Sequence, residues 1–137
     1  MSFSRECETP RKDRKIVLQE KRCKITFNNA SCDTVRQVEI DGCVIKNGKR
    51  CDWLLITIDS TEHYIELKGC DIKRAVKQLE RTIILVSEDA IKLKKHSFII
   101  STRCPLMSTE IQNIKFRFKK KYNSSLIVKN NYYEHNL

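Results

Sequence analysis

The stretch CDWLLITIDSTEHYIELKGCDIKRAVKQLERTI, residues 51–83, changes its hydrophobic period partway along. Residues 51–58 are almost continuously apolar, a pattern typical of a strand buried on both faces. Residues 64–68 form a second expected strand after a polar segment suited to a turn. Beyond Gly69 the apolar residues recur at a spacing of about 3.6, which predicts a helix capped by Asp71. The stretch therefore predicts strand, turn, strand and helix.

The sequence on either side extends this pattern. A strand is expected from Val35 to Ile40, before possible turns at Asp41-Gly42 and Asn47-Gly48. After the helix we expect a strand over 96–101, a helix over 111–122 with a possible Ser108 cap, and a strand over 126–128. From Val35 the expected order is β-β-β-α-β-α-β. The fold class is thus α/β (α+β), a mixed sheet with helices packed on it.

The first 24 residues differ from the rest of the chain. Residues 1–24 mix charges of both signs with one short apolar run, which predicts a flexible or loosely docked basic arm, either solvated or lying on a phosphate backbone. A chain of 137 residues with 40% hydrophobic residues has the size of one ordinary domain. We therefore expect one α/β domain over residues 25–137.

Net charge narrows the range of partners. The formal charge of +10 would attract polyanions such as nucleic acid, although solubility alone can also account for a basic protein. No cleavable apolar leader and no run near the ~18 apolar residues of a membrane span is present. We expect a cytoplasmic protein without a membrane partner.

Cysteines and histidines give little sign of a metal or redox site. The chain has seven cysteines and no close C-x-x-C pair, which argues against a disulfide framework and a zinc ribbon. Cys43 and Cys51 could meet across a hairpin, but buried free thiols are the expectation. The histidines, His63, His96 and His135, are scattered along the sequence, so zinc hydrolase chemistry has little support.

Three charged residues on the two central strands can meet. Glu66 and Lys68 are two apart on a strand and project from one face, while Ile65 enters the opposite face. Asp52 lies at the start of the preceding strand. An odd-length loop of three or five residues would set Asp52 opposite Lys68 and on the same face as Glu66, whereas an even-length loop would separate them.

Such a trio suits phosphodiester hydrolysis. Two carboxylates can hold Mg²⁺ or Mn²⁺ through oxygen ligands, and a bound cation polarises the phosphate and activates water. A lysine adds a compact positive charge that can stabilise the reacting phosphate. The alternative is an ordinary cross-strand ion pair on a solvated sheet face.

Asp52, followed by a short hairpin, Glu66-Leu67-Lys68 and a helix, resembles the PD-(D/E)XK nuclease superfamily, which includes restriction endonucleases and Holliday-junction resolvases. The resemblance covers about residues 35–101 and implies a restriction-endonuclease-like sheet flanked by helices. It also implies that Asp52 and Glu66 bind metal and that Lys68 assists catalysis. Cys51 stands where the family name has proline.

Other candidate residues follow from position. Gln78, at the border of the apolar helix face, resembles the polar helix residue that several branches aim at the site, with surface exposure as the alternative. Glu39 or Asp41 could supply a further acidic group, and each could equally be an ordinary strand or turn residue. The segment IKFRFKKKY alternates basic and aromatic residues, as nucleic-acid grooves do, or forms one wet helix face. The candidate phosphate contacts are Arg103, Lys115, Arg117, Lys119, Lys120 and Lys121.

The sequence thus favours a metal-dependent nuclease acting on DNA more than RNA, in microbial repair or in defence against foreign DNA. A homodimer could cut both strands, since one site cuts one strand. The chain has no glycine-rich phosphate loop, so we expect no organic cofactor and no nucleotide hydrolysis. The alternative, from a different class, is a catalytically silent nuclease-fold module that binds nucleic acid or protein.

Overall fold

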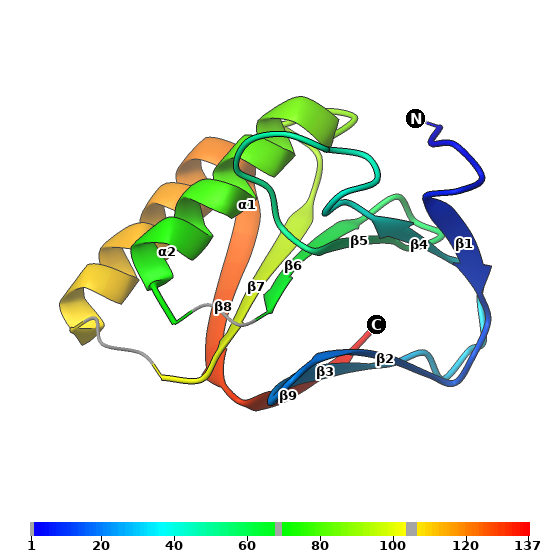
Figure 1. Ribbon diagram of the computed structural model, residues 1–137, viewed down its shortest axis with the longest axis horizontal. Coiled ribbons are helices and arrows are strands. Elements are labelled where there is room, and N and C mark those ends of the chain that lie inside the picture. The colour runs from blue at the N-terminus through cyan, green and yellow to red at the C-terminus, as the bar shows by residue number, and fades with distance from the viewer. Residues whose placement is uncertain (1, 68–69, 104–106) are drawn as a thin grey trace.

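The computed structural model describes residues 2–67, 70–103 and 107–137 and has a mixed α+β architecture. Figure 1 shows three layers: two helices, a six-stranded sheet beneath them, and a three-stranded sheet against the other face of the large sheet. The elements are β1 (Glu8–Arg11), β2 (Lys15–Glu20), β3 (Cys23–Asn28), β4 (Val35–Glu39), β5 (Trp53–Ile56), β6 (Glu62–Leu67), α1 (Ile72–Val86), β7 (Lys95–Ser101), α2 (Ser108–Tyr122), β8 (Ser124–Asn130) and β9 (Tyr132–Asn136).

The large sheet has the strand order β1-β4-β5-β6-β7-β8. Its first four strands pair antiparallel, and β6, β7 and β8 pair parallel with a helix in each crossover. From β4 to β8 the elements follow the expected order β-β-β-α-β-α-β. The expectation of a sheet flanked by helices needs correction, because both helices cover one face and the small sheet covers part of the other (Figure 1).

Helix α1 confirms the prediction from its apolar spacing. The Asp71 side chain caps it by accepting a hydrogen bond from the Arg74 backbone N–H at 3.1 Å. Helix α2 begins at Ser108 itself, after Met107, with no side-chain cap, so the expected Ser108 cap is wrong. It ends at Tyr122, and the C-cap residue Asn123 has a φ of 53°, in the left-handed region that commonly terminates helices.

Two apolar clusters hold the layers together. The first fills the space between the helices and the large sheet, and includes Leu54, Leu79 and Phe118. The second joins the other face of the large sheet to the small sheet, and includes Phe27 and Phe98. Successive residues of a strand face opposite sides, so β6 contributes Tyr64 to the first cluster and Ile65 and Leu67 to the second.

The N-terminal residues differ from expectation. Residues 1–24, expected as a loosely docked arm, contain β1, β2 and the start of β3. Ile16 and Leu18 of β2 alternate with exposed residues and are buried in the second cluster. Strand β3 pairs in parallel with β9 near the other end of the chain. Burial and pairing therefore make this segment part of both sheets, with β1 in the large sheet and β2 and β3 in the small one.

The cysteines also need a correction. Cys7 and Cys43 form a disulfide, which links the start of the chain to the loop after β4. Cys51 is buried as a free thiol, as expected, and its backbone N–H donates to Thr82 Oγ1 at 2.9 Å. Within the part of the chain that the structure describes, no helix is long and apolar enough to cross a membrane.

Candidate functional site

The pairing of β5 with β6 brings Asp52 and Glu66 together. Ile56 lies opposite Glu62 across a five-residue loop, and Trp53 lies opposite Ile65. The Asp52 backbone N–H continues this pairing by donating to Ile65 O at 3.0 Å. Asp52 therefore stands opposite Glu66 on the same face, as the predicted odd-length loop requires. The register differs by two residues from the expected one, which set Asp52 opposite Lys68.

Strand β5 is also shorter than expected. The structure has β5 only over Trp53–Ile56, where residues 51–58 were expected to be a strand. Asp52 is thus the last residue of the loop between β4 and β5. Its Oδ2 accepts a hydrogen bond from the Leu67 backbone N–H at 2.7 Å, which fixes the carboxyl beside the end of β6.

Burial and mutual repulsion raise the pKa values of the two carboxyls. Burial, followed by the charge of Asp52, raises the pKa of Glu66 to about 9. Burial raises the pKa of Asp52 to about 6, although the Leu67 N–H opposes the shift. The interaction with Asp52 thus favours the protonated form of the Glu66 carboxyl. Near neutral pH the pair therefore holds a proton, as close carboxyls do when two negative charges would repel.

One oxygen of this pair lacks a partner. Glu66 is 7% exposed, and its Oε1 is buried without a hydrogen-bond partner among the described residues. Buried polar atoms are nearly always hydrogen-bonded, and an exception points to a missing ligand or a functional role. The pair therefore presents oxygen ligands of the kind that Mg²⁺ and Mn²⁺ prefer.

The pair opens into a cleft of about 370 Å³ between the end of β6 and the start of α1. The other residues that line this cleft come from β2, the loop after β4, and α1. They are Glu20, Asp41, Leu67, Cys70, Asp71, Arg74 and Gln78. The cleft is thus acidic at its base and carries one arginine on its helical wall.

Two candidates from the sequence reach the cleft and one does not. Gln78 lines it from α1, at the edge of the apolar face, as expected. Asp41 lines it too, but its Oδ1 already accepts a hydrogen bond from Arg50 Nε at 2.7 Å and its side chain is 51% exposed. Glu39 lies opposite Trp53 on the other face of the sheet and does not line this cleft, but it lines a smaller neighbouring pocket together with Asp41 and Asp52.

Sequence reasoning missed Glu20 and Arg74. Glu20 ends β2, in the segment expected to be an arm, and its charge helps raise the pKa of Asp52. Arg74 lies one turn into α1, and its position on the helix follows from the Asp71 cap. An i, i+4 relation between Arg74 and Gln78 could have indicated that they share a helix face.

Lys68, the third member of the predicted trio, lies outside the described residues. Arg103 is exposed after β7, and most of the basic residues predicted for phosphate contacts are exposed on α2. Arg117 donates to Glu80 of α1 at 2.8 Å, so it also joins the two helices. Lys115 is half-buried. The α2 residues in question are Lys115, Arg117, Lys119, Lys120 and Lys121.

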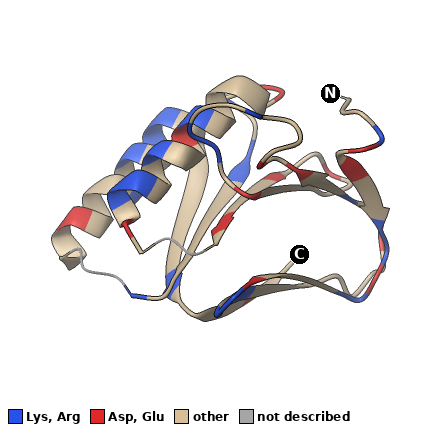
Figure 2. Cartoon of the chain, viewed as in Figure 1, with Lys and Arg blue, Asp and Glu red and all other residues tan. Residues whose placement is uncertain are grey.

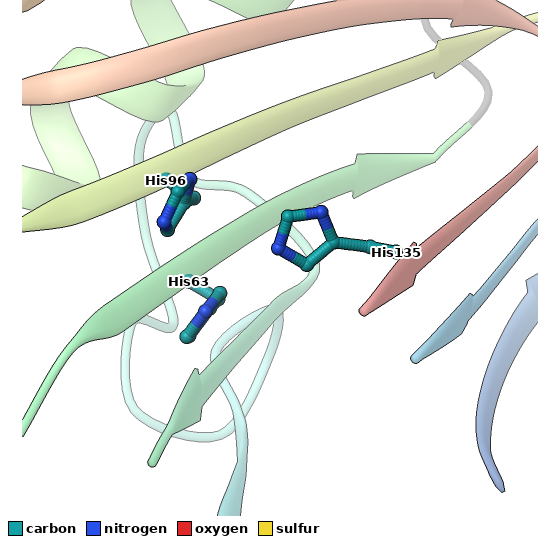
Figure 3. Close-up of side chains that lie close together, drawn as sticks. All are labelled: His63, His96 and His135. Carbon is teal, nitrogen blue, oxygen red and sulfur yellow. The ribbon is translucent and has the colours of Figure 1, made fainter. Parts of the chain in front are cut away.

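The three histidines are not scattered in space. His63 on β6 lies opposite His96 on β7, and His135 reaches toward both from β9 of the small sheet (Figure 3). One ring nitrogen from each lies within 4.8 Å of the others. The sequence expectation that the histidines do not form a cluster is therefore wrong. They lie on the opposite face of the large sheet from Glu66.

Comparison of the chain with protein-family models, with curated proteins and with solved structures finds no match.

Proposed function

We propose that this protein is a metal-dependent nuclease of the PD-(D/E)XK type that hydrolyses phosphodiester bonds, with DNA as the favoured substrate. The observation that carries the proposal is the pairing of Asp52 with Glu66 on adjacent strands, at the mouth of an acidic cleft. The restriction-endonuclease-like core corresponds to β4 through β8. The same order of elements and the position of the carboxyls within it support this assignment.

The carboxyl pair fits a hard divalent cation. Glu66 Oε1 has no hydrogen-bond partner among the described residues, and burial makes its charge costly without one. Asp52 and Glu66 would hold Mg²⁺ or Mn²⁺, with Asp41 at the edge of the same cleft. A cation must displace the proton of Glu66, so binding should release a proton and strengthen as pH rises.

The chain's own residues would orient the substrate around this pair. Arg74 can contact a phosphate from the wall of the cleft, and Lys68 directly follows Leu67 in sequence. Figure 2 shows Lys and Arg recurring along both helices, and the net charge of +10 favours a polyanion. Gln78 can hydrogen-bond a phosphate oxygen or a water in the cleft.

Hydrolysis adds a water oxygen to phosphorus and breaks the bond from phosphorus to the leaving sugar oxygen, which gains a proton. When bound, the cation supplies Lewis-acid stabilisation of the charge on the phosphate. Asp52 is held by the Leu67 N–H, so its orientation does not depend on the ligand. The acidic base of the cleft would repel nucleic acid without a cation, which makes metal a condition for productive contact as well as for chemistry.

The decisive experiment measures cleavage of plasmid, single-stranded, branched and flapped DNA, with RNA controls, in Mg²⁺, Mn²⁺ or EDTA. Asp52→Asn and Glu66→Gln should each lower the rate by at least about two orders of magnitude, since several kcal/mol of charge stabilisation is lost. Glu134→Gln is the control, because it removes one carboxylate from β9 of the small sheet, away from the cleft.

Cleavage that is unchanged in Asp52→Asn and Glu66→Gln, or that persists in EDTA, would overturn the proposal. Metal-insensitive binding of nucleic acid with no cleavage on any substrate would instead favour the catalytically silent module. Proton release on Mn²⁺ addition, measured in weakly buffered solution, gives a second readout that does not need the correct substrate. It should be present in the wild type and lost in Glu66→Gln.

A further inference from the structure

The histidine cluster lies between the two sheets. His63 and His96 occupy paired positions of the parallel strands β6 and β7, with their rings stacked at 5.1 Å between centroids. The ring of His135, from β9, lies 5.2 Å from that of His96 and 6.0 Å from that of His63. Figure 3 shows the three side chains converging from separate strands. The cluster is therefore formed by tertiary structure and joins the large sheet to the small one.

The ring nitrogens are disposed as metal ligands require. His63 Nδ1 lies 3.3 Å from Leu55 O, and donation to this carbonyl leaves Nε2 with a free lone pair. His96 Nδ1 is buried and has no hydrogen-bond partner among the described residues. One nitrogen from each ring comes within 4.8 Å of the other two, so small side-chain movements would bring all three to a common ion.

The rings also have the protonation state that ligation needs. Burial lowers the pKa of His63 to about 3, and burial followed by the charge of His96 lowers that of His135 to about 4. Both are therefore neutral at neutral pH and need not lose a proton to bind a cation. This contrasts with Glu66, which must lose one.

The cluster forms part of the wall of a pocket of about 330 Å³. The pocket also reaches Thr57 and Asp59 in the loop between β5 and β6, so a ligand bound to the histidines would remain open to solvent on one side. Asp59 is held in the loop because its Oδ1 accepts hydrogen bonds from Thr57 Oγ1 at 2.5 Å and from Thr61 N at 3.2 Å.

We propose that His63, His96 and His135 bind a late first-row divalent cation, Zn²⁺ foremost, with a fourth position open to the pocket. Three imidazoles and one exchangeable position are the ligand set of many zinc sites that bind water or a small anion. Nitrogen ligands select this class of metal over Mg²⁺. The ion would clamp β9 to β6 and β7. This site does not depend on the proposed nuclease activity, because it lies on the other face of the large sheet.

An aromatic cluster without metal is the competing interpretation. Phe27 and Phe98 contact the histidine rings, with Phe27 6.1 Å from His63 and Phe98 5.0 Å from His135. Packing of this kind accounts for buried neutral rings. It does not account for a buried ring nitrogen without a partner, which a metal or a bound water would satisfy.

The test uses the full chain, freed of metal with EDTA and dialysed, in the Glu66→Gln background so that the carboxyl pair cannot hold a cation. Calorimetry measures Zn²⁺ binding, and Co²⁺ serves as a spectroscopic probe whose visible absorption reports a tetrahedral nitrogen site. We expect one Zn²⁺ per chain and an intense Co²⁺ spectrum that Zn²⁺ displaces. Adding His135→Phe should weaken Zn²⁺ binding by more than about a hundredfold, beyond the loss typical of an outer-shell partner.

His135→Phe keeps an aromatic ring against Phe98, so folding should be retained, and far-UV circular dichroism in EDTA checks this. Asn136→Ala, at the next position of β9, is the matched control and should bind Zn²⁺ as the parent does. Absence of Zn²⁺ binding in the folded parent would overturn the proposal and leave the aromatic cluster. Equal Zn²⁺ affinity in folded His135→Phe would also overturn it, because the ion would then lie elsewhere.

Discussion

Replacing Glu66 by glutamine should remove a specific loss of stability at alkaline pH. In the folded protein the pKa of Glu66 is raised to about 9 from the ordinary 4.5, chiefly by burial. Between these values the folded state keeps a proton that the unfolded chain releases. The stability that protonated Glu66 contributes is therefore fully present below about pH 4.5 and is lost as pH rises toward 9.

The size of the effect follows from the number of protons. One proton released on unfolding lowers the free energy of unfolding by about 1.4 kcal/mol per pH unit. From pH 6.5 to 8.5 the wild type should lose about 2.5 kcal/mol through Glu66, slightly less than two full units because titration begins near 9. Asp52 acts mainly below this window, because its pKa in the folded protein is about 6. Burial lowers the pKa of all three histidines from 6.5, so they raise stability as pH passes 6.5, but they are common to both proteins.

The assay is urea unfolding followed by far-UV circular dichroism at pH 6.5, 7.5 and 8.5, in EDTA and without reductant. Glu66→Gln keeps the shape of the side chain but cannot ionise, so the loss attributed to Glu66 should be absent. Groups common to both proteins cancel in the difference between them. Glu134→Gln is the control: its pKa is lowered by hydrogen bonds from Asn28 and Tyr132, so it is ionised throughout the window and should behave as wild type.

Parallel loss of stability in the wild type and in Glu66→Gln would refute the reasoning, because Glu66 would then be ionised in the folded state. Millimolar Mn²⁺ adds a second arm. A cation bound at the pair replaces the proton, so it should reduce the alkaline loss in the wild type and have no such effect in Glu66→Gln. If Mn²⁺ did not reduce the alkaline loss in the wild type, the conclusion that Glu66 is protonated would still stand, but the proposed metal site would be contradicted.

The other predictions concern the scaffold and the separation of the two sites. Replacing Cys7 and Cys43 by serine should lower the free energy of unfolding, measured by urea titration without reductant, by about 4 kcal/mol. This is the loop-closure estimate for a separation of 36 residues. Asp71→Ala should cost about 1 kcal/mol by the same measurement, because α1 loses its cap. Phe118→Ala, on the buried face of α2, should cost about 3 to 5 kcal/mol. His135→Phe should leave Mg²⁺-dependent cleavage within about twofold of wild type, since nitrogen ligands do not serve Mg²⁺.

Local sequence pattern predicted the part of the fold from β4 to β8 because each element there carries its own signal. The apolar spacing from Ile72 to Ile83 and the Asp71 cap set the start and the buried face of α1. The glycines at the predicted turns, Gly42 and Gly48, have φ values of 79° and 84°, which glycine adopts readily. A side chain at Gly48 would also meet the Arg81 guanidinium at 2.6 Å.

The three-stranded sheet could not be predicted in the same way. Its central strand, β3, pairs Lys24 with Tyr132 and Asn28 with Asn136, more than a hundred residues apart along the chain. Ile16 and Leu18 do alternate with polar residues, a strand signal, but the charges around them resemble those of a solvated arm. Only the long-range pairing decides between the two interpretations.

The two sites differ in how well they could be predicted from the sequence. Asp52 and Glu66 meet through a hairpin, so their shared face follows from loop length, and only the register, displaced by two residues, was wrong. His63 and His96 meet through a parallel crossover, and His135 arrives from another sheet. No local spacing encodes such contacts, which is why the histidines looked scattered.

Strand β6 explains how one short segment can serve both sites. Its alternation sends Glu66 toward the helices and His63 toward the small sheet, so the sites share a backbone but not a face. Their ligands also differ in kind: carboxylate oxygens suit Mg²⁺ or Mn²⁺, whereas imidazole nitrogens suit Zn²⁺. Zn²⁺ could occupy either site, but Mg²⁺ prefers oxygen ligands and should not bind three imidazoles. Mg²⁺ responses therefore report on the carboxyl pair alone, and a Zn²⁺ response that survives Glu66→Gln reports on the histidines.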